Sequence, residues 1–403
     1  TQGNLEGGSR SMTRTSSKLD LIKPSATIMV TMKAMELKAR GKDIVSLGAG
    51  EPDFDTPEHI RDAAISAIHD GQTRYTQVDG TPELKQAIIA KLKRDNDLEF
   101  TPQEIIASNG AKQSLYNLLV ATLNHGDEVI VPAPYWVSYP DMVKLADGLP
   151  AILSCGPEHD FKITAKQLHN SLTENTRMVI LNSPSNPTGK VYTEEEYREI
   201  GEVLLEHPRI LIACDDIYEF IYWGETPYRT FLNVCPHLAS RTVVINGVSK
   251  GYAMTGWRIG YLAGPEDLVS AMRKVQGQST SCPGSVSQAA AIAALNGPQD
   301  CVEDMRLAFR ERYAFMHQAL NQLPGVDCPS CDGAFYVFPS FQDFIDARDD
   351  IRDDAELATW MLEEAGVSTV PGSAFGAPGH LRLSYAASMD YLQDAIQRIE
   401  AAM

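Results

Sequence analysis

Short apolar runs alternate with helical patterns through the middle of this chain, and no other feature restricts its fold as strongly. The runs "EIIAS", "DEVIVP", "RMVILNSP", "RILIACDD" and "RTVVINGVSK" are each short enough to form one buried strand. A helix between consecutive strands returns the chain to the same end of the sheet, so the strands run parallel. The pattern therefore predicts an α/β fold in which helices cover both faces of a mostly parallel sheet.

Helix start signals support this alternation. They include Thr56-Pro57, Thr81-Pro82 and the capping-box pair Thr193 and Glu196. After about residue 297 the pattern changes to a long helix at 301–323, a segment "GAFYVFP", a helix near 354–365 and a terminal helix. This change predicts a smaller α+β domain after the sheet.

The charge balance narrows the classes of partner. The chain has 35 Lys and Arg against 53 Asp and Glu, a formal charge of −18. Such a surface repels nucleic-acid backbones, so we expect no nucleic-acid partner. No apolar run approaches the roughly 20 residues that span a bilayer, so we expect no membrane partner either.

The N-terminus and the cysteines add further expectations. Residues 1–18 lack the apolar core of a signal peptide, and we expect them to be a tail that is partly artificial. The 7 cysteines have no framework spacing, which favours reduced thiols in a cytoplasmic protein. Cys328 and Cys331 form a C-x-x-C, but no second pair is suitably spaced, so we expect no metal.

Polar residues follow the apolar runs at the end of the sheet where parallel folds bind ligands. They are Asn182, Asp215, Ser249 and Lys250. Taken alone, Asp215 can be a turn or capping residue, and Lys250 a surface lysine. The functional alternative is that Lys250 is a partly buried amine, able to bond covalently to an aldehyde, whose pKa is lowered by burial and by the cation of Arg258.

Two further segments can present groups to such a cleft. In "SNGAKQSLYNLL", Gly110 and Ala111 begin a helix whose unpaired N–H groups suit a phosphate, although an ordinary helix start is the alternative. In "NSPSNPTG" a sharp turn presents Asn186, which turn chemistry alone also explains. Neither G-x-G-x-x-G nor G-x-x-x-x-G-K-[ST] occurs, which argues against a nucleotide-dependent dehydrogenase and against a P-loop protein.

Together, in this order on an α/β chain, these motifs resemble the class I/II aminotransferases, which carry pyridoxal 5′-phosphate (PLP) on the fold-type-I scaffold. The resemblance runs from about Leu19 to the C-terminus, and "SK…TGWRIGY" and "NSPSNPTG" are its most specific parts. "KPSAT", "GEPDFDTPEHI", "GAKQSLYNLL" and "PAPYWVSYPDM" are most similar to the bacterial aspartate aminotransferases of the Iβ type. The resemblance implies a seven-stranded sheet in a large PLP-binding domain at 61–296. Residues 19–60 and 297–403 would form the smaller domain.

The resemblance also implies the residues of a site. Lys250 would hold PLP and move the proton, Asp215 would pair with the ring nitrogen, and Tyr218 with the ring oxygen. The other implied cofactor contacts are Gly110, Ala111, Lys112, Trp136, Asn186, Ser249, Arg258 and, from the neighbouring subunit of a homodimer, Tyr75. The implied substrate contacts are Gly48, Trp136, Asn186, Arg382, Lys112, Ser25 and Thr27.

The implied substrate is a dicarboxylate. Arg382 would grip the α-carboxylate, and Lys112, Ser25 and Thr27 the distal one. A cation in the first turn of a helix is disfavoured by the helix dipole, so Lys112 suggests another use, although contact with the cofactor phosphate or with solvent is the alternative.

The implied reaction moves the amino group of L-aspartate to 2-oxoglutarate by a ping-pong mechanism, with amino acids and 2-oxo acids as partners. Prephenate transamination and broader amino-acid specificity are the alternatives. A PLP-binding regulator fused to a DNA reader would need a basic helix-turn-helix segment, for which the tail before Leu19 leaves no room.

Overall fold

A seven-stranded sheet forms the centre of the protein, whose computed structural model describes residues 14–403. Residues 1–13 of the predicted tail lie outside the described residues. The strand order is β2-β8-β7-β6-β5-β3-β4. The strands are β2 (Ile105–Ser108), β3 (Glu128–Ala133), β4 (Leu149–Ser154), β5 (Thr176–Asn182), β6 (Leu211–Asp215), β7 (Thr242–Gly247) and β8 (Gly260–Ala263). In this sheet only β8 runs antiparallel to its neighbours, which confirms the predicted mostly parallel, seven-stranded sheet.

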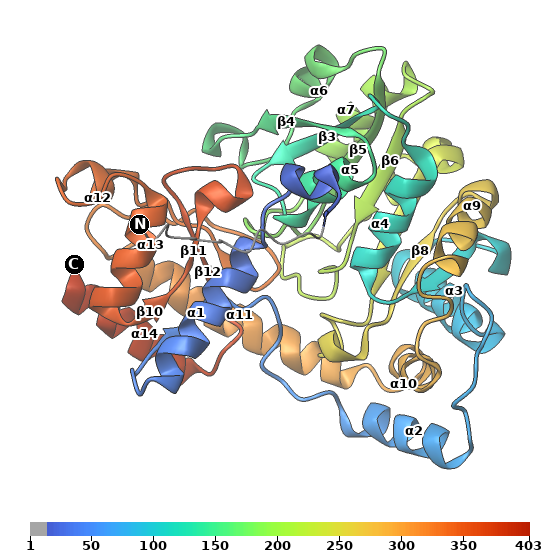
Figure 1. Cartoon of the computed structure of the whole chain (residues 1–403), viewed down its shortest axis with the longest axis horizontal. Coiled ribbons are helices and arrows are strands. Elements are labelled where there is room, and N and C mark those ends of the chain that lie inside the picture. Colours follow the sequence, from blue (N-terminus) through green and yellow to red (C-terminus); the bar gives the residue numbers. More distant parts are fainter. Residues whose placement is uncertain (1–13) are drawn as a thin grey trace, which may run out of the picture.

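Helices cover both faces of the sheet because successive strand residues point to opposite sides. In β5, Met178 and Ile180 pack into one core, and Val179 and Leu181 into another. The first face carries α4 (Ala111–Thr122), α5 (Ser138–Leu145) and α9 (Glu266–Gly277). The opposite face carries α2 (Glu58–His69), α3 (Pro82–Asn96), α6 (Ala165–Ser171), α7 (Glu194–Leu205) and α10 (Ser285–Asn296) (Figure 1).

Two of the predicted helix starts are confirmed. The Thr81 hydroxyl accepts a hydrogen bond from the Leu84 amide at the start of α3. Thr193 and Glu196 form a reciprocal capping box at the start of α7. These side chains satisfy N–H groups that have no partner within their own helix.

The predicted capping role of Thr56 is wrong. Helix α2 begins at Glu58, with Pro57 as the preceding residue and no side-chain cap. The Thr56 hydroxyl instead donates to the Ala253 carbonyl at 2.6 Å and accepts from Trp257 Nε1 at 2.9 Å. The Thr56 hydroxyl therefore bonds to residues that are distant in the sequence and does not cap the helix.

Residues 26–46 and 300–402 pack together beside the sheet (Figure 1). Strand β1 pairs in parallel with β10, and the β1 residue Val45 belongs to the same core as Leu381 and Leu392. The helices here are α1 (Ala26–Ala39), α11 (Asp300–Leu320), α12 (Gln342–Asp346), α13 (Asp354–Trp360) and α14 (Met389–Ala402). The strands are β1 (Val45–Ser46), β9 (Tyr336–Val337), β10 (Val367–Ser368), β11 (Val370–Pro371) and β12 (Leu381–Ser384).

Short helical turns complete the fold. They are α8 (Phe231–Val234), the 3₁₀ turns Ser17–Leu21, Pro102–Glu104, Pro157–His159, Pro236–Arg241, Thr255–Trp257 and Gly372–Phe375, and a π-turn at Met361–Ala365. The helix predicted at 301–323 is α11, and the helix predicted near 354–365 is α13 continued by the π-turn.

Parallel strands bring distant polar residues to one edge of the sheet. Asn182 ends β5 and is in register with Asp215, which ends β6. Lys250 follows β7, the next strand in the order. The edge that the sequence predicted to bind ligands therefore carries these three side chains.

Candidate active site

A cavity of about 370 Å³ lies at this edge, between the sheet and the segments around residues 25–31, 49–51, 336 and 382. All the predicted site residues line it except Gly48, Gly110 and Tyr75. Those that do are Ser25, Thr27, Ala111, Lys112, Trp136, Asn186, Asp215, Tyr218, Ser249, Lys250, Arg258 and Arg382. Gly48 and Gly110 contact lining residues, as described below. The Tyr75 side chain lies elsewhere and is 93% exposed.

Lys250 is half-buried, and its amine lies in this cavity. Its Nζ donates to the Gly50 carbonyl at 2.5 Å. The pKa of Lys250 is lowered to about 8: burial is the largest cause, Arg382 and Arg258 also lower the pKa, and Glu51 and Asp215 raise it. The sequence predicted Arg258 as a cause of the lowered pKa, and the larger cause is burial. An amine with this pKa is partly unprotonated in mildly alkaline solution, as a general base requires.

Asp215 is a buried carboxylate with one strong partner. The hydroxyl of Tyr139 donates to its Oδ2 at 2.5 Å, and the Ile217 amide donates to its Oδ1 at 3.4 Å. Burial raises the pKa of Asp215, and the hydrogen bond from Tyr139 opposes that rise. Sequence reasoning missed Tyr139, although it lies in the quoted segment "PAPYWVSYPDM".

The start of helix α4 forms a cationic cradle. A Cβ on Gly110 would lie 2.3 Å from Arg258 Nη2, so a glycine is required for the guanidinium to lie there. The Gly110 amide donates to the Ser108 carbonyl. The amides of Ala111 and Lys112, in contrast, have no hydrogen-bond partners among the described residues. Two free amides beside an arginine form a typical phosphate site.

Tyr218 faces the cavity from the turn after β6. Its hydroxyl shares a hydrogen bond of 2.8 Å with the hydroxyl of Tyr336, and the Lys250 amine lies 5.8 Å from the centre of its ring. Burial raises the pKa of Tyr218 well above its ordinary value, so the phenol stays protonated and can donate a hydrogen bond. Tyr336 was not predicted, because it comes from β9, more than a hundred residues away in the sequence.

Arg382 is a buried cation without an acid partner. Its side chain is 1% exposed, its Nη1 donates to Asn186 Oδ1 at 2.9 Å, and its Nη2 donates to the Gly48 carbonyl at 2.7 Å. Its Nε has no hydrogen-bond partner among the described residues. The guanidinium lies 4.3 Å from the centre of the Tyr336 ring, and burial lowers its pKa. An unneutralised buried cation facing a cavity is suited to a carboxylate ligand.

Lys112 supplies a further cation to the same cavity. Its Nζ lies 4.8 Å from the centre of the Trp136 ring, and its pKa is lowered by partial burial and by Arg258. The Trp136 ring in turn packs edge-on against Tyr139, with 5.4 Å between ring centres. Ser25 and Thr27 reach the cavity from the start of α1, and Ser25 makes no side-chain cap there.

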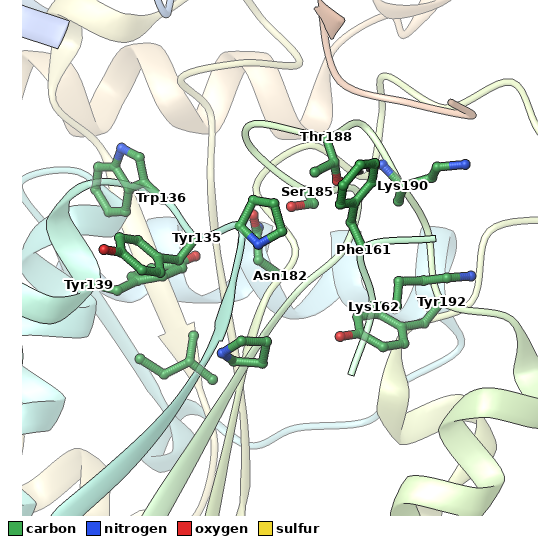
Figure 2. A pocket seen from close by; sticks show the side chains of 13 residues that line it. Tyr135, Trp136, Tyr139, Phe161, Lys162, Asn182, Ser185, Thr188, Lys190 and Tyr192 are labelled. Carbon is green, nitrogen blue, oxygen red and sulfur yellow. Dashed lines mark hydrogen bonds between the residues drawn. The ribbon is translucent and has the colours of Figure 1, made fainter. Parts of the chain in front are cut away.

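A second, much smaller cavity of about 20 Å³ adjoins the site (Figure 2). It shares Trp136, Tyr139 and Asn182 with the larger one. Its two lysines are neutralised, Lys162 by Glu196 and Lys190 by Asp160. This space is about the size of one water molecule, so we assign it no ligand.

Asp216 is a buried carboxyl next to the site. Neither of its oxygens has a hydrogen-bond partner among the described residues, and burial, together with the charge of Glu219, raises its pKa to about 7. Between pH 3.8 and about 7 the folded protein keeps a proton that the unfolded chain releases, so stability falls as the pH rises through this window.

Asp216→Asn should therefore stabilise the protein at pH 8 by on the order of 3 kcal/mol, and by less at pH 5, because asparagine carries no charge to bury. Urea unfolding of both proteins at the two pH values measures the difference. A stabilisation that is the same at pH 5 and pH 8 would contradict the assignment of a neutral Asp216.

Two kinds of feature are absent from residues 14–403. No group of three or more His, Cys, Asp or Glu side chains there could hold a metal ion. None of the helices described there is long and apolar enough to cross a membrane.

Comparison with known proteins decides the family. The family model of the class I and II aminotransferases matches residues 42–399. The chain belongs to this family. It is a PLP-dependent transaminase, and PLP is its cofactor.

The relatives of this aminotransferase are similar over almost their whole length. It is 53% identical over 393 residues to the aspartate/prephenate aminotransferase of Nitrosomonas europaea, covering 96% of this chain and 99% of that protein. It is 50% identical over 380 residues to the aspartate aminotransferase of Geobacillus stearothermophilus, covering 94% of this chain and 96% of that protein.

Solved structures agree with the fold of this aminotransferase. The aspartate aminotransferase of Rhizobium meliloti superposes with a TM-score of 0.93 at 45% identity, covering 97% of this chain and 98% of that chain. The Thermus thermophilus aspartate aminotransferase with maleate gives a TM-score of 0.91 at 40% identity, covering 97% and 100%. The predicted fold-type-I architecture is therefore confirmed.

Proposed function

We propose that this aminotransferase moves the amino group of L-aspartate to 2-oxoglutarate, giving oxaloacetate and L-glutamate. The observation that carries the proposal is the buried, unneutralised Arg382 in the same cavity as the amine of Lys250 and the cation of Lys112. Two cations suit a substrate with two carboxylates. Close relatives are named aspartate aminotransferases, and the Thermus thermophilus enzyme is described with maleate, a dicarboxylate.

The residues of the cavity fit PLP. The free amides of Ala111 and Lys112, with Arg258 and Ser249, suit its phosphate. Asp215 suits the ring nitrogen, because a buried carboxylate favours a protonated partner. We assign the ring oxygen to Tyr218 and Asn186, and the ring face to Trp136. When bound, PLP supplies an electron sink for the bond broken at the substrate Cα.

Lys250 moves the proton in this proposal. Its amine can take a proton from the substrate Cα and deliver it again, because its lowered pKa leaves a usable unprotonated fraction. Arg382 holds the α-carboxylate through its two-pronged guanidinium and thereby orients Cα toward Lys250. The Gly50 carbonyl, which accepts from the free lysine amine, can hold that amine in the cavity.

Lys112→Ala tests the choice of a dicarboxylate. We expect kcat/KM for aspartate to fall about 100-fold, because a charge-assisted contact to the distal carboxylate contributes about 1.5–3 kcal/mol. The value for alanine, which has no distal carboxylate, should stay within about twofold. Steady-state kinetics with both amino acids and 2-oxoglutarate measure the two effects.

Lys166→Ala is the matched control for this test. Lys166 is the second residue of α6, as Lys112 is of α4, and both follow an alanine and precede a glutamine. It is exposed and outside the cavity, so it should change neither substrate. Equal losses for aspartate and alanine in the Lys112 variant would remove the distal-carboxylate role.

Prephenate is a second candidate substrate. The Nitrosomonas europaea relative is named an aspartate/prephenate aminotransferase, and prephenate also carries two carboxylates. A panel of amino donors, including arogenate, with 2-oxoglutarate and oxaloacetate separates the two activities. Aspartate as the better donor, with little turnover of arogenate, would leave only the first candidate.

The domains, the oligomer and the location complete the proposal. We assign residues 19–60 and 297–403 to one smaller domain and residues 61–296 to the PLP-binding domain, supported by the pairing of β1 with β10.

We also propose a homodimer in which Tyr75, 93% exposed here, reaches the neighbouring active site. The molar mass in solution would test the dimer. All 7 cysteines are unpaired, which supports a reducing, cytoplasmic location.

A further inference from the structure

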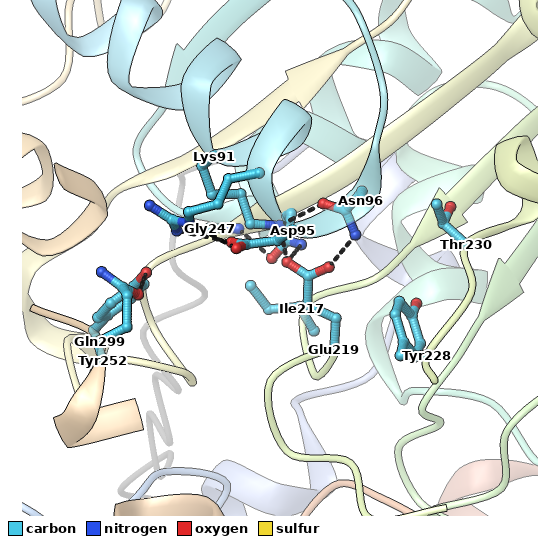
Figure 3. A network of polar contacts seen from close by, with 12 residues as sticks. Lys91, Asp95, Asn96, Ile217, Glu219, Tyr228, Thr230, Gly247, Tyr252 and Gln299 are labelled. Carbon is cyan, nitrogen blue, oxygen red and sulfur yellow. Dashed lines mark hydrogen bonds and ion pairs between the residues drawn. The ribbon is translucent and has the colours of Figure 1, made fainter. Parts of the chain in front are cut away.

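A buried polar network lies outside the residues that line the cavity, beside helix α3 (Figure 3). Its centre is the carboxylate of Glu219, which forms an ion pair with Lys91. Glu219 Oε1 also accepts from Asn246 Nδ2 at 2.9 Å, and Oε2 accepts from Asn96 Nδ2 at 2.7 Å. The exposed fractions are 0% for Lys91, 7% for Asn96, 7% for Glu219 and 1% for Asn246. The carboxylate is therefore buried, and each of its oxygens has a polar partner.

Glu219 joins the two chain segments that carry the proposed catalytic residues. It directly follows Tyr218, and the two side chains have different surroundings, since Tyr218 lines the cavity and Glu219 does not. Its partner Asn246 lies near the end of β7 and also accepts from the Gly247 amide at 2.8 Å. Lys250 comes just after that strand. One carboxylate thus connects the turn of Tyr218 with the strand end before Lys250.

A second contact connects the same two segments on the other side of Lys250. A Cβ on Gly251 would lie 2.4 Å from Phe220 Cδ2, so this glycine allows the Phe220 ring to pack directly on the backbone. The Lys91 amine lies 5.0 Å from the centre of the Phe220 ring. Residues 219 and 220 therefore hold the chain both before and after Lys250.

Stability alone does not explain a charged pair at this place. Removing two charges from water is costly, and a buried ion pair is often no more stabilising than apolar residues of similar size. What such a pair adds is a defined geometry, because each charge requires its partner at hydrogen-bond distance.

We propose that the Lys91–Glu219 pair is a positioning element of the active site, which fixes the Tyr218 ring relative to the Lys250 amine, 5.8 Å away. The inference rests on the proposed function, because it assigns these two residues to the reaction. Lys91 and Glu219 touch neither cofactor nor substrate and act through the backbone that they hold.

Glu219→Gln and Lys91→Met, each made in the PLP-bound enzyme, test the inference. We expect kcat with aspartate to fall about 10- to 100-fold with KM nearly unchanged, because misplacement by an ångström costs about that much in rate. The midpoint of the pH-dependent change in the bound cofactor's absorbance should shift by at least about half a pH unit, because Tyr218 is the residue that we assign to the ring oxygen.

Lys85→Met is the matched control. Lys85 lies on the same helix, is buried, and pairs with buried Asp79 away from the cavity. It should lower the melting temperature and leave kcat and the spectral midpoint unchanged. If the Lys91 and Glu219 variants behave in the same way, the pair is structural and the inference is overturned.

A double variant keeps the test decisive if the single ones do not fold. Lys91→Met/Glu219→Leu removes both charges together and leaves no unpaired buried charge, so it should fold. It should show the same spectral shift and loss of kcat; wild-type values of both would overturn the inference. A wild-type enzyme that binds PLP but does not turn over aspartate would instead contradict the proposed function, and so the two failures are distinguishable.

Discussion

Replacing Lys250 with alanine should lower kcat with aspartate by about 10⁴-fold, because the variant loses the amine that we propose as both covalent anchor and general base. The Lys250 side chain is half-buried, and its amine is hydrogen-bonded to the Gly50 carbonyl and has a pKa of about 8, so it can accept a proton. Lys112 also lines the cavity, but its amine lies against the Trp136 ring. Single-turnover kinetics with aspartate, followed through the cofactor's absorbance, measure the loss.

Lys250→Arg is the control for charge. The guanidinium stays protonated at every accessible pH, so this variant should be as inactive as the alanine variant. Borohydride reduction and peptide mapping should place the cofactor on residue 250 in the wild type and on neither variant. A label on another lysine, or substantial activity in Lys250→Ala, would contradict the assignment of this residue.

The sheet was predictable because its signal is local and repeated. Each buried strand is a run of apolar residues, and the helices between the runs carry their own start signals, such as Thr81 and Thr193. The two-residue strands, such as β1 (Val45–Ser46) and β10 (Val367–Ser368), were not predictable, because two residues have no periodicity. The failed cap at Thr56 has a related cause, since its partner Ala253 is distant in the sequence.

The site was predictable where chemistry follows a strand end. Asp215 and Lys250 were found from their places after apolar runs, and the family resemblance supplied their roles. Tyr139 and Tyr336 were missed because each reaches the site across the fold, and no local pattern marks a tyrosine that will meet a carboxylate or another phenol. The Gly50 carbonyl was missed because any residue offers one.

Arg382→Met should lower kcat/KM about 10³-fold for aspartate and alanine alike, because both need their α-carboxylate held. Losing a buried charge pair with the ligand costs about 2–5 kcal/mol. This uniform loss differs from the selective loss expected for Lys112→Ala. Arg382→Lys, which keeps the charge and loses the two-pronged geometry, should recover only part of the activity. Steady-state kinetics with the two amino acids measure all three variants.

Arg382→Met should cost little stability in the substrate-free enzyme. This result would separate a role of Arg382 in binding from a role in stability. Arg382 is buried without an acid partner, so methionine removes an unneutralised charge and loses the hydrogen bonds to Asn186 and Gly48 and the cation–π contact with Tyr336. Arg312 is the matched contrast: it is also buried, but both its terminal nitrogens donate to the carboxylate of Asp53, at 2.7 and 3.1 Å. Arg312→Met breaks a two-pronged ion pair, but the acid that it leaves, Asp53, is exposed to solvent, so the variant should be more destabilising than Arg382→Met by about 1 kcal/mol. Chemical unfolding of both variants measures the difference, and equal losses would mean that Arg382 is part of the framework and not reserved for a carboxylate ligand.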